Sequence, residues 1–216
     1  QPGDDSAGSV ASTEPGNAQT IGGDVFGLAF EPFARFAWTL PPLLTTKPQT
    51  LSFDQASSLP VAWSTAHTVL KRAAARNHHQ LVIQAAAGGV GLKTVEYAYW
   101  AGVSVLGTAG SAHKHAQLRS ITVDKLASSR ISAAFSCGSA RLLDCMRSHS
   151  VLNSLSFDFT SISIGFLGET SAFNEIGMRN VWTSARYHMT SSHSIYSVVA
   201  NDMDWEREPV WMHRVL

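Results

Sequence analysis

The sequence predicts an α/β fold whose core is a doubly wound, parallel, six-stranded sheet of the Rossmann type. Three observations support this prediction. From Leu81 onward, short apolar runs alternate with segments rich in helix-forming residues, which is the pattern of right-handed βαβ units. The first of these runs leads into a glycine-rich turn that opens a helix. The strand count, six, is that of a complete doubly wound dinucleotide-binding domain.

The individual elements follow from hydrophobic periodicity and from turn-forming residues. Strands are expected at residues 81–84, 103–107, 125–127, 150–153, 172–176 and 195–199. Helices are expected at residues 62–75, 92–100, 112–119, 139–146 and 159–167. Ser52 and Gln55 form a capping box, so a short helix should begin there and end at or before Pro60. Further upstream we expect a flexible tail, a turn with a short strand, and a second short strand, at residues 1–20, 21–28 and 33–38.

Composition narrows the classes of function. The chain has 216 residues, a formal net charge of +0 and 15% charged residues, so it lacks the basic surface of a nucleic-acid or anionic-membrane binder. Its two cysteines give no disulfide framework, and a reducing, cytoplasmic compartment is expected. The N-terminus resembles neither a signal nor a transit peptide, and no apolar run approaches the ~20 residues that cross a bilayer.

Common catalytic motifs are missing from the sequence. Nine histidines occur without a C-x-x-C or H-E-x-x-H pattern, so no metal site is expected. The G-x-S-x-G elbow of serine hydrolases and the lysine pattern of P-loops are absent as well.

The candidate cofactor-binding turn reads Gln-Ala-Ala-Ala-Gly-Gly-Val-Gly and ends at Gly91. Gly88 and Gly91 match the second and third glycines of G-x-G-x-x-G, and Ala86 stands in place of the first. The second glycine lets the backbone approach a pyrophosphate, and the third lets the helix pack closely on the strand. Gly89 and Val90 would open that helix, whose N–H groups attract phosphate. A tight βα turn without a ligand is the alternative interpretation.

The residues after the second strand indicate which cofactor is preferred. NAD-preferring folds carry an acid about 20 residues beyond the glycines, where it holds the adenosine ribose. This sequence has no acidic residue between Glu96 and Asp124. It has Thr108, Ser111 and Lys114 instead, which would bind a 2′-phosphate that a carboxylate would repel. We therefore expect NADPH rather than NADH, the alternative being that Lys114 is a solvated surface lysine.

Several short motifs keep a common order and spacing along nearly the whole chain. They are GDVFGLA at 23–29, STAH at 64–67, AAAGGVG at 85–91, GS at 110–111 with Lys114, ASSR at 127–130, VLNSLS at 151–156 and EIG at 175–177. Through them the chain resembles the enoyl reductase domain of a modular polyketide synthase, in the zinc-free, quinone-oxidoreductase-like branch of the medium-chain dehydrogenase/reductase superfamily. The resemblance implies NADPH as cofactor, an acyl-carrier-bound α,β-enoyl thioester as substrate, and neighbouring synthase domains as partners.

The same resemblance implies roles for individual residues. Arg130 would lie against the cofactor phosphate, and Gly110 belongs to the same cofactor-binding set. Asn153 and Gly177 would line the nicotinamide, at strand ends where open α/β sheets bind their ligands. Thr65 would begin the helix that approaches the nicotinamide phosphate, although its hydroxyl could equally bond back along the helix.

The chain departs from the family pattern at the candidate proton donors. The family has a lysine after EIG, whereas this chain has Met178, followed by Arg179. Methionine has no proton to donate, and arginine is effectively never deprotonated. The family's second candidate acid corresponds to Asp202, which could act if burial raises its pKa, or could be a solvated turn residue.

The resemblance also divides the chain. Residues 1–50 would be a partial GroES-like substrate-domain segment with a linker, and residues 51–216 the NADPH-binding domain. The rest of the substrate barrel would be missing, so exposed apolar faces and weak turnover are expected. Two alternatives stay open, a degenerate, non-catalytic domain of a megasynthase and a stand-alone quinone-oxidoreductase-like enzyme.

Overall fold

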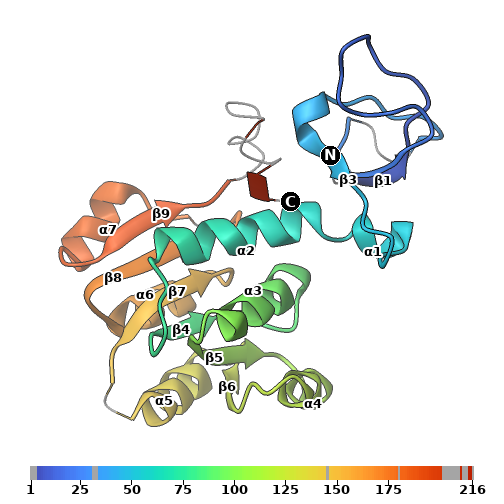
Figure 1. Ribbon diagram of the computed structural model, residues 1–216. Coiled ribbons are helices and arrows are strands. Elements are labelled where there is room, and N and C mark those ends of the chain that lie inside the picture. The colour runs from blue at the N-terminus through green and yellow to red at the C-terminus, as the bar shows by residue number, and fades with distance from the viewer. Residues whose placement is uncertain are drawn as a thin grey trace. The chain divides into compact units, whose positions relative to one another are not determined.

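A computed structural model describes residues 4–30, 34–144, 146–179, 181–200, 210 and 214–215 (Figure 1). The chain divides into two compact units, one formed by Gln1–Thr65 with Ala200–Leu216 and the other by Ala66–Val199. The assignment of residues 1–50 and 51–216 to a substrate domain and a cofactor domain stays a prediction.

The larger unit carries a parallel sheet with the strand order β6-β5-β4-β7-β8-β9. Its strands are β4 (Gln80–Ile83), β5 (Ser104–Ala109), β6 (Lys125–Ser128), β7 (Ser148–Asn153), β8 (Leu167–Glu175) and β9 (Ile195–Val198). This is the order of the doubly wound dinucleotide-binding fold, so the predicted fold class is confirmed. The order reverses between β4 and β7, and the carboxyl ends of these strands define the crevice in which such sheets bind ligands.

Helices cover both faces of this sheet (Figure 1). They are α2 (Pro60–Arg72), α3 (Gly89–Trp100), α4 (Ala112–Ser120), α5 (Ser132–Leu143), α6 (Asp158–Gly165) and α7 (Ser184–Thr190). Side chains alternate along β4 and so reach two separate cores. Leu81 and Ile83 join a core shared with α2, α3 and α4, whereas Val82 joins the core shared with α5, α6 and α7.

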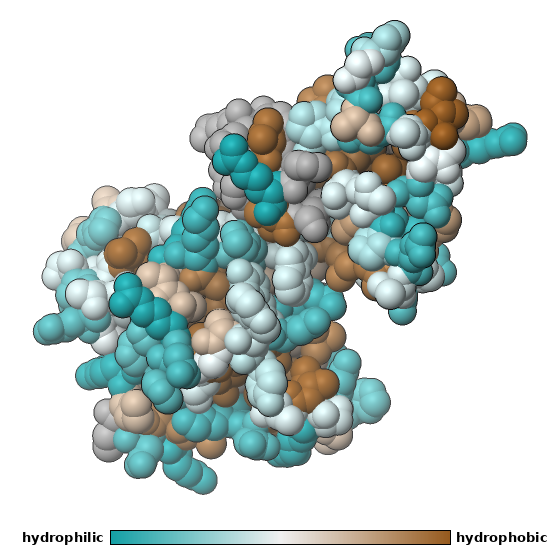
Figure 2. All heavy atoms as spheres, viewed as in Figure 1, coloured by the Kyte–Doolittle hydropathy of each residue, from teal (hydrophilic) through white to brown (hydrophobic). Residues whose placement is uncertain are grey.

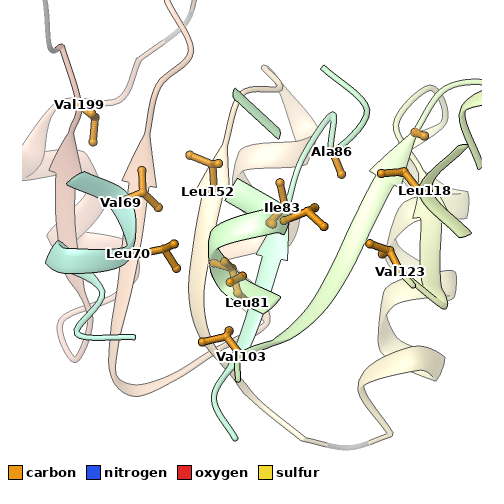
Figure 3. Close-up of a cluster of buried hydrophobic side chains, with 13 residues drawn as sticks. Val69, Leu70, Leu81, Ile83, Ala86, Val103, Leu118, Val123, Leu152 and Val199 are labelled. Carbon is orange, nitrogen blue, oxygen red and sulfur yellow. The ribbon is translucent and has the colours of Figure 1, made fainter. Parts of the chain in front are cut away.

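The first of these cores packs β4 against α2, which precedes it in the chain, and against α3 and α4, which follow it. Figure 3 shows Ile83 between Val69 and Leu70 of α2 on one side and Leu118 and Val123 on the other. All five side chains are at most 5% exposed. Burying a side chain of this size contributes roughly 1.5–3 kcal/mol each, so β4 and the turn after it rest on a well-packed base.

The smaller unit contains an antiparallel sheet of β1 (Asp5–Ser9), β2 (Asp24–Leu28) and β3 (Leu44–Thr46), with η1 (Pro41–Leu43) and α1 (Phe53–Ala56). The expected flexible tail is therefore wrong at its start, because β1 pairs with β2 from Asp5 opposite Leu28. The second short strand, expected at 33–38, does not form among its described residues. Trp38 makes a single bridge with Phe30, on which its ring stacks at 4.3 Å.

Two helices begin at other residues than the sequence predicts, α2 at Pro60 and α5 at Ser132. The capping box is confirmed, since Ser52 Oγ accepts the Gln55 N–H at 3.1 Å and Gln55 Oε1 accepts the Ser52 N–H at 3.0 Å. Pro60 begins α2 rather than only following α1, because a proline is tolerated in the first turn, where no N–H is needed. α5 begins at Ser132, earlier than the expected residue 139.

The surface mixes hydrophilic and hydrophobic side chains, as the hydropathy colouring in Figure 2 shows. This agrees with the low proportion of charged residues. Among the helices of the described ranges, none has both the length and the hydropathy that crossing a bilayer requires.

One residue of the larger unit holds a conformation that suits glycine. Phe157, the N-cap of α6, has φ 60° and ψ −127°, the geometry of the first central residue of a type II′ turn. We expect Phe157→Gly to be more stable than Phe157→Ala by about 1 kcal/mol, because alanine removes the ring but keeps the strained Cβ. The ring itself is 75% exposed and stabilises the fold little. Chemical denaturation of both variants measures the difference, and equal stabilities would contradict the expectation.

Candidate functional site

The glycine-rich turn follows the carboxyl end of β4, beside the point where the strand order reverses. Gly88 is the N-cap of α3 and makes no side-chain bond to the first turn, so the N–H groups there remain available to a ligand. Gly91 is tightly packed, because a Cβ on it would lie 2.6 Å from the Ala85 carbonyl oxygen and 2.7 Å from the Ala86 Cα. Gly89 has open space in the same position. The turn thus combines a close helix approach with an open helix N-terminus.

The neighbouring strand β5 holds this turn through Thr108. Ala85, which has φ 49°, donates its N–H to Thr108 Oγ1 at 2.9 Å, and Ala86 donates to the Thr108 carbonyl at 2.8 Å. Thr108 and Ala86 are both fully buried. The expected contact of Thr108 with a 2′-phosphate is therefore corrected, since its side chain is enclosed and its hydroxyl is bonded to the turn. Thr108 and Ala86 shape the turn from within, and Val90 lies half-buried in the first turn of α3.

A cationic patch, defined as Ser111, Lys114 and Arg130, lies at the carboxyl ends of β5 and β6. Ser111 is the N-cap of α4, and its Oγ accepts the Lys114 N–H at 3.4 Å. Arg130 crosses over Gly110, where a Cβ would lie 2.6 Å from the arginine Nε. Lys114 and Arg130 are exposed, and neither has an ion-pair partner in the described ranges. Because Gly110 has no side chain, the guanidinium of Arg130 can lie beside the start of α4.

The carboxyl ends of β7 and β8 carry a buried polar pair instead. Asn153 and Glu175 lie opposite each other in the parallel register and are 0% and 2% exposed. Asn153 Nδ2 donates to Glu175 Oε2 at 2.7 Å, and the Gly177 N–H donates to Glu175 Oε1 at 2.7 Å. Burial raises the pKa of Glu175 to about 7, against the lowering effect of these two hydrogen bonds. Sequence reasoning missed Glu175 as a site residue, although an acid that closes an apolar strand was a usable signal.

The side chain of Asn153 is turned inward, toward the protein. Its Nδ2 also donates to the Leu155 carbonyl at 2.8 Å, while its Oδ1 is buried with no hydrogen-bond partner in the described part of the chain. Gln84, at the end of β4, holds the same loop, because its Oε1 accepts the N–H groups of Ser154 and Leu155 at 3.2 and 2.9 Å. The side chain of Asn153 therefore supports the loop after β7 from inside the protein, and the backbone of that loop faces the crevice.

The remaining predicted residues are spread more widely. Met178 is 88% exposed and follows Gly177, with exposed Arg179 after it. Asp202 lies outside the described residues. Thr65 is 7% exposed within α2, where the first segment of the smaller unit ends, and its role at the cofactor stays a prediction.

A cavity of about 490 Å³ lies elsewhere, where β8 begins at Leu167. Its lining includes Arg147, Glu169 and His193. Because it lies near the amino end of β8, it is separate from the crevice at the carboxyl ends of the strands. In the described ranges, no three side chains among His, Cys, Asp and Glu come together as metal ligands would.

Comparison with known proteins identifies polyketide synthases as relatives. No family model matches the chain. Erythronolide synthase EryA2 of Saccharopolyspora erythraea is 37% identical over 179 residues, which covers 81% of this chain and 5% of that protein. Highly reducing polyketide synthase cla2 of Cladosporium cladosporioides is 33% identical over 153 residues, covering 69% of this chain and 6% of that protein. The chain thus spans a small part of each of these proteins.

Solved structures that share the fold of this chain include an enoyl reductase. The CurK enoyl reductase superposes with a TM-score of 0.92 at 26% identity, covering 98% of this chain and 64% of that chain. A mycobacterial protein, Rv1454c, solved in complex with NADPH, superposes with a TM-score of 0.85 at 20% identity, covering 98% and 69%, and so shares the fold. The resemblance predicted from the motifs is confirmed by these sequences and structures.

The packing at Gly91 gives a test of the turn. We expect Gly91→Ala to lower the free energy of unfolding by about 1–3 kcal/mol, because its methyl group would overlap rigid backbone atoms. Gly89→Ala is the matched control, since its methyl group would meet open space. Urea denaturation measures both. Equal losses in the two variants would show that the close approach at Gly91 is not what holds the helix to the turn.

Proposed function

Because this chain resembles polyketide synthase enoyl reductases in sequence and in fold, we propose that it is an NADPH-dependent oxidoreductase that reduces an α,β-enoyl thioester. One observation carries the proposal. The open N-terminus of α3 at Gly88 and the cationic patch lie at the same edge of the sheet, after β4 on one side and β5 and β6 on the other. That order along the sheet suits a dinucleotide with a pyrophosphate and a separate phosphate on its adenosine ribose.

The residues present fit the cofactor at its phosphate groups. The N–H groups in the first turn of α3 would hold the pyrophosphate, and Gly88 leaves the backbone open to it. Lys114 and Arg130 would bind the 2′-phosphate, the arginine through two parallel N–H donors. Ser111 adds a hydroxyl at the N-terminus of α4. The patch contains no carboxylate that would repel the phosphate.

The second half of the cofactor would lie along the ends of β7 and β8. A doubly wound sheet is built of two mononucleotide-binding halves, so the nicotinamide falls on the side of the switch point away from the cationic patch. NADPH supplies the hydride for the reduction when it is bound. The chain's own contribution is to orient the nicotinamide against the loops after Asn153 and Glu175, the second of which contains Gly177.

The proton that completes the reduction needs a separate source. Met178 cannot supply it, and Arg179 keeps its charge. We assign this role to Asp202 as part of the proposal. The substrate would be carried by an acyl carrier, and the protein would act in the cytoplasm. Its neighbours would be other synthase domains, since the synthases to which the chain is similar are far longer than the part it matches.

The cationic patch predicts a cofactor preference. We expect the chain to bind NADPH more tightly than NADH, and Lys114→Ala or Arg130→Ala to reduce that preference about 10–100-fold, the effect of losing one charge-assisted contact. Arg119→Ala is the control, because it removes an exposed cation at the other end of α4. Nicotinamide fluorescence titration measures both affinities. Equal affinities for the two cofactors in the unmodified chain would contradict the proposal.

The exposed methionine after Gly177 predicts slow protonation. We expect Met178→Lys to raise the rate of NADPH oxidation with a crotonyl-type thioester when the substrate-binding region is complete, because general acid catalysis contributes about 10²–10⁴-fold. Met189→Lys, a similarly exposed methionine on α7, is the matched control. Fast turnover by the unmodified chain with no gain from lysine would contradict the role given to position 178. A chain that binds NADPH and stays inactive in both forms would favour a non-catalytic domain.

A further inference from the structure

Glu175 is a buried acid that the proposed function leaves without a role. It ends β8, is 2% exposed, and carries no ion-pair partner in the described ranges. Burying a carboxyl group is costly, and it is tolerated only where hydrogen bonds satisfy its oxygens. Two donors do so here, the Asn153 side-chain amide and the Gly177 backbone N–H, each at 2.7 Å.

The carboxyl group also occupies the place that a side chain on Gly177 would take. A Cβ on Gly177 would lie 2.7 Å from Glu175 Oε1. Glycine at 177 and the acid at 175 are therefore one arrangement, in which the carboxyl closes back onto the chain that follows it. This is a physical reason for the E-I-G motif, because a Cβ at position 177 would compete with the Glu175 carboxyl group for the same space.

The hydrogen bond between Asn153 and Glu175 joins the loop after β7 to the loop after β8. Asn153 leads into the loop after β7, and Gly177 belongs to the loop after β8. A further bond links the same two loops, because Ser156 Oγ donates to the Arg179 carbonyl at 3.0 Å. Glu175 is the element of this link that receives donors from both sides.

We propose that Glu175 is a positioning residue for the nicotinamide half of NADPH, because its carboxyl group fixes the loops after β7 and β8 as one rigid surface. This inference rests on the proposed function. The cationic patch lies on the other side of the switch point, after β5 and β6, so Glu175 should not affect binding of the adenosine phosphates. The two halves of the cofactor site can therefore be tested separately.

The protonation state of Glu175 gives the surface a pH dependence. The carboxylate accepts both N–H donors in charge-assisted hydrogen bonds, whereas the protonated acid would accept them only as weaker, neutral ones. Burial raises the pKa of Glu175 to about 7. The titratable group that faces it in the described ranges is Tyr196 of β9, whose phenol has its pKa raised to about 12 by burial and by Glu175, and so stays neutral. The clamp should therefore weaken as the pH falls through about 7.

The test compares two ligands on the full chain. NADPH spans both halves of the site, whereas 2′,5′-ADP carries only the adenosine and its phosphates. We expect Glu175→Gln to weaken NADPH binding roughly tenfold, the effect of one charge-assisted hydrogen bond, and to leave 2′,5′-ADP binding unchanged. Glu169→Gln is the matched control, since it changes an exposed acid on the same strand. Retained 2′,5′-ADP binding also shows that the variant is folded.

The ratio of the two affinities supplies a second readout. The ratio of NADPH affinity to 2′,5′-ADP affinity should fall more steeply between about pH 8 and pH 6 in the unmodified chain than in Glu175→Gln. The phosphate monoesters of the two ligands titrate in the same way with both proteins, so their contribution cancels when the two proteins are compared. Gly177→Ala should give the same selective loss of NADPH binding, because its methyl group would displace the carboxyl.

Each outcome separates this inference from the proposed function. An unmodified chain that binds 2′,5′-ADP while Glu175→Gln keeps full NADPH affinity would overturn the positioning role alone. Equal loss of both ligands in Glu175→Gln would overturn it too, since the residue would then act on the whole fold. A chain that binds neither ligand would overturn the proposed function, and this inference with it.

Discussion

Gly91 brings the first turn of α3 against the backbone of residues 85 and 86, closer than any side chain would allow. The rest of the site depends on this approach. It keeps the N-terminus of α3 directed at the edge of the sheet, and it requires the turn to be held from the other side. Thr108 does that through its hydroxyl and its carbonyl, both of which accept N–H groups of the turn. Fixed in this way, the end of the helix keeps its N–H groups and its dipole directed at the place where a phosphate would bind.

The two halves of the crevice differ in their physics. The half after β5 and β6 is exposed and cationic, and solvent screens it, so its affinity should depend on salt. In the half after β7 and β8, Glu175 and Asn153 are buried and support the backbone loops from within. Charge would select the ligand on one side, and rigid shape would orient it on the other.

Sequence reasoning succeeded where local pattern and tertiary structure agree. β4 contains a short apolar run and is buried on both faces, and that pattern alone identified it. β1 was missed because Asp-Ser-Ala-Gly-Ser has little strand preference, and its conformation comes from pairing with β2. Thr108 was placed at a strand end correctly, but its inward direction depends on how β5 lies against the turn.

The hydrogen bond between Asn153 and Glu175 could not be predicted from the sequence either. The two residues are far apart in sequence and meet only because β7 and β8 are neighbours in register. Asn153 lies in the VLNSLS motif and Glu175 in the EIG motif, but neither motif indicates that the two side chains are hydrogen-bonded to each other. The glycine that follows Glu175 acquires its meaning only when the carboxyl group is seen in the space of its missing side chain.

Hydrogen exchange of backbone amides with and without NADPH tests the central claim most directly. If the cofactor lies along the carboxyl ends of the strands, protection should rise in the first turn of α3, at Ser111 and Arg130, and in the loops after Asn153 and Glu175. Protection confined to the cavity beside Arg147 and His193, or no change anywhere, would contradict this account of the site.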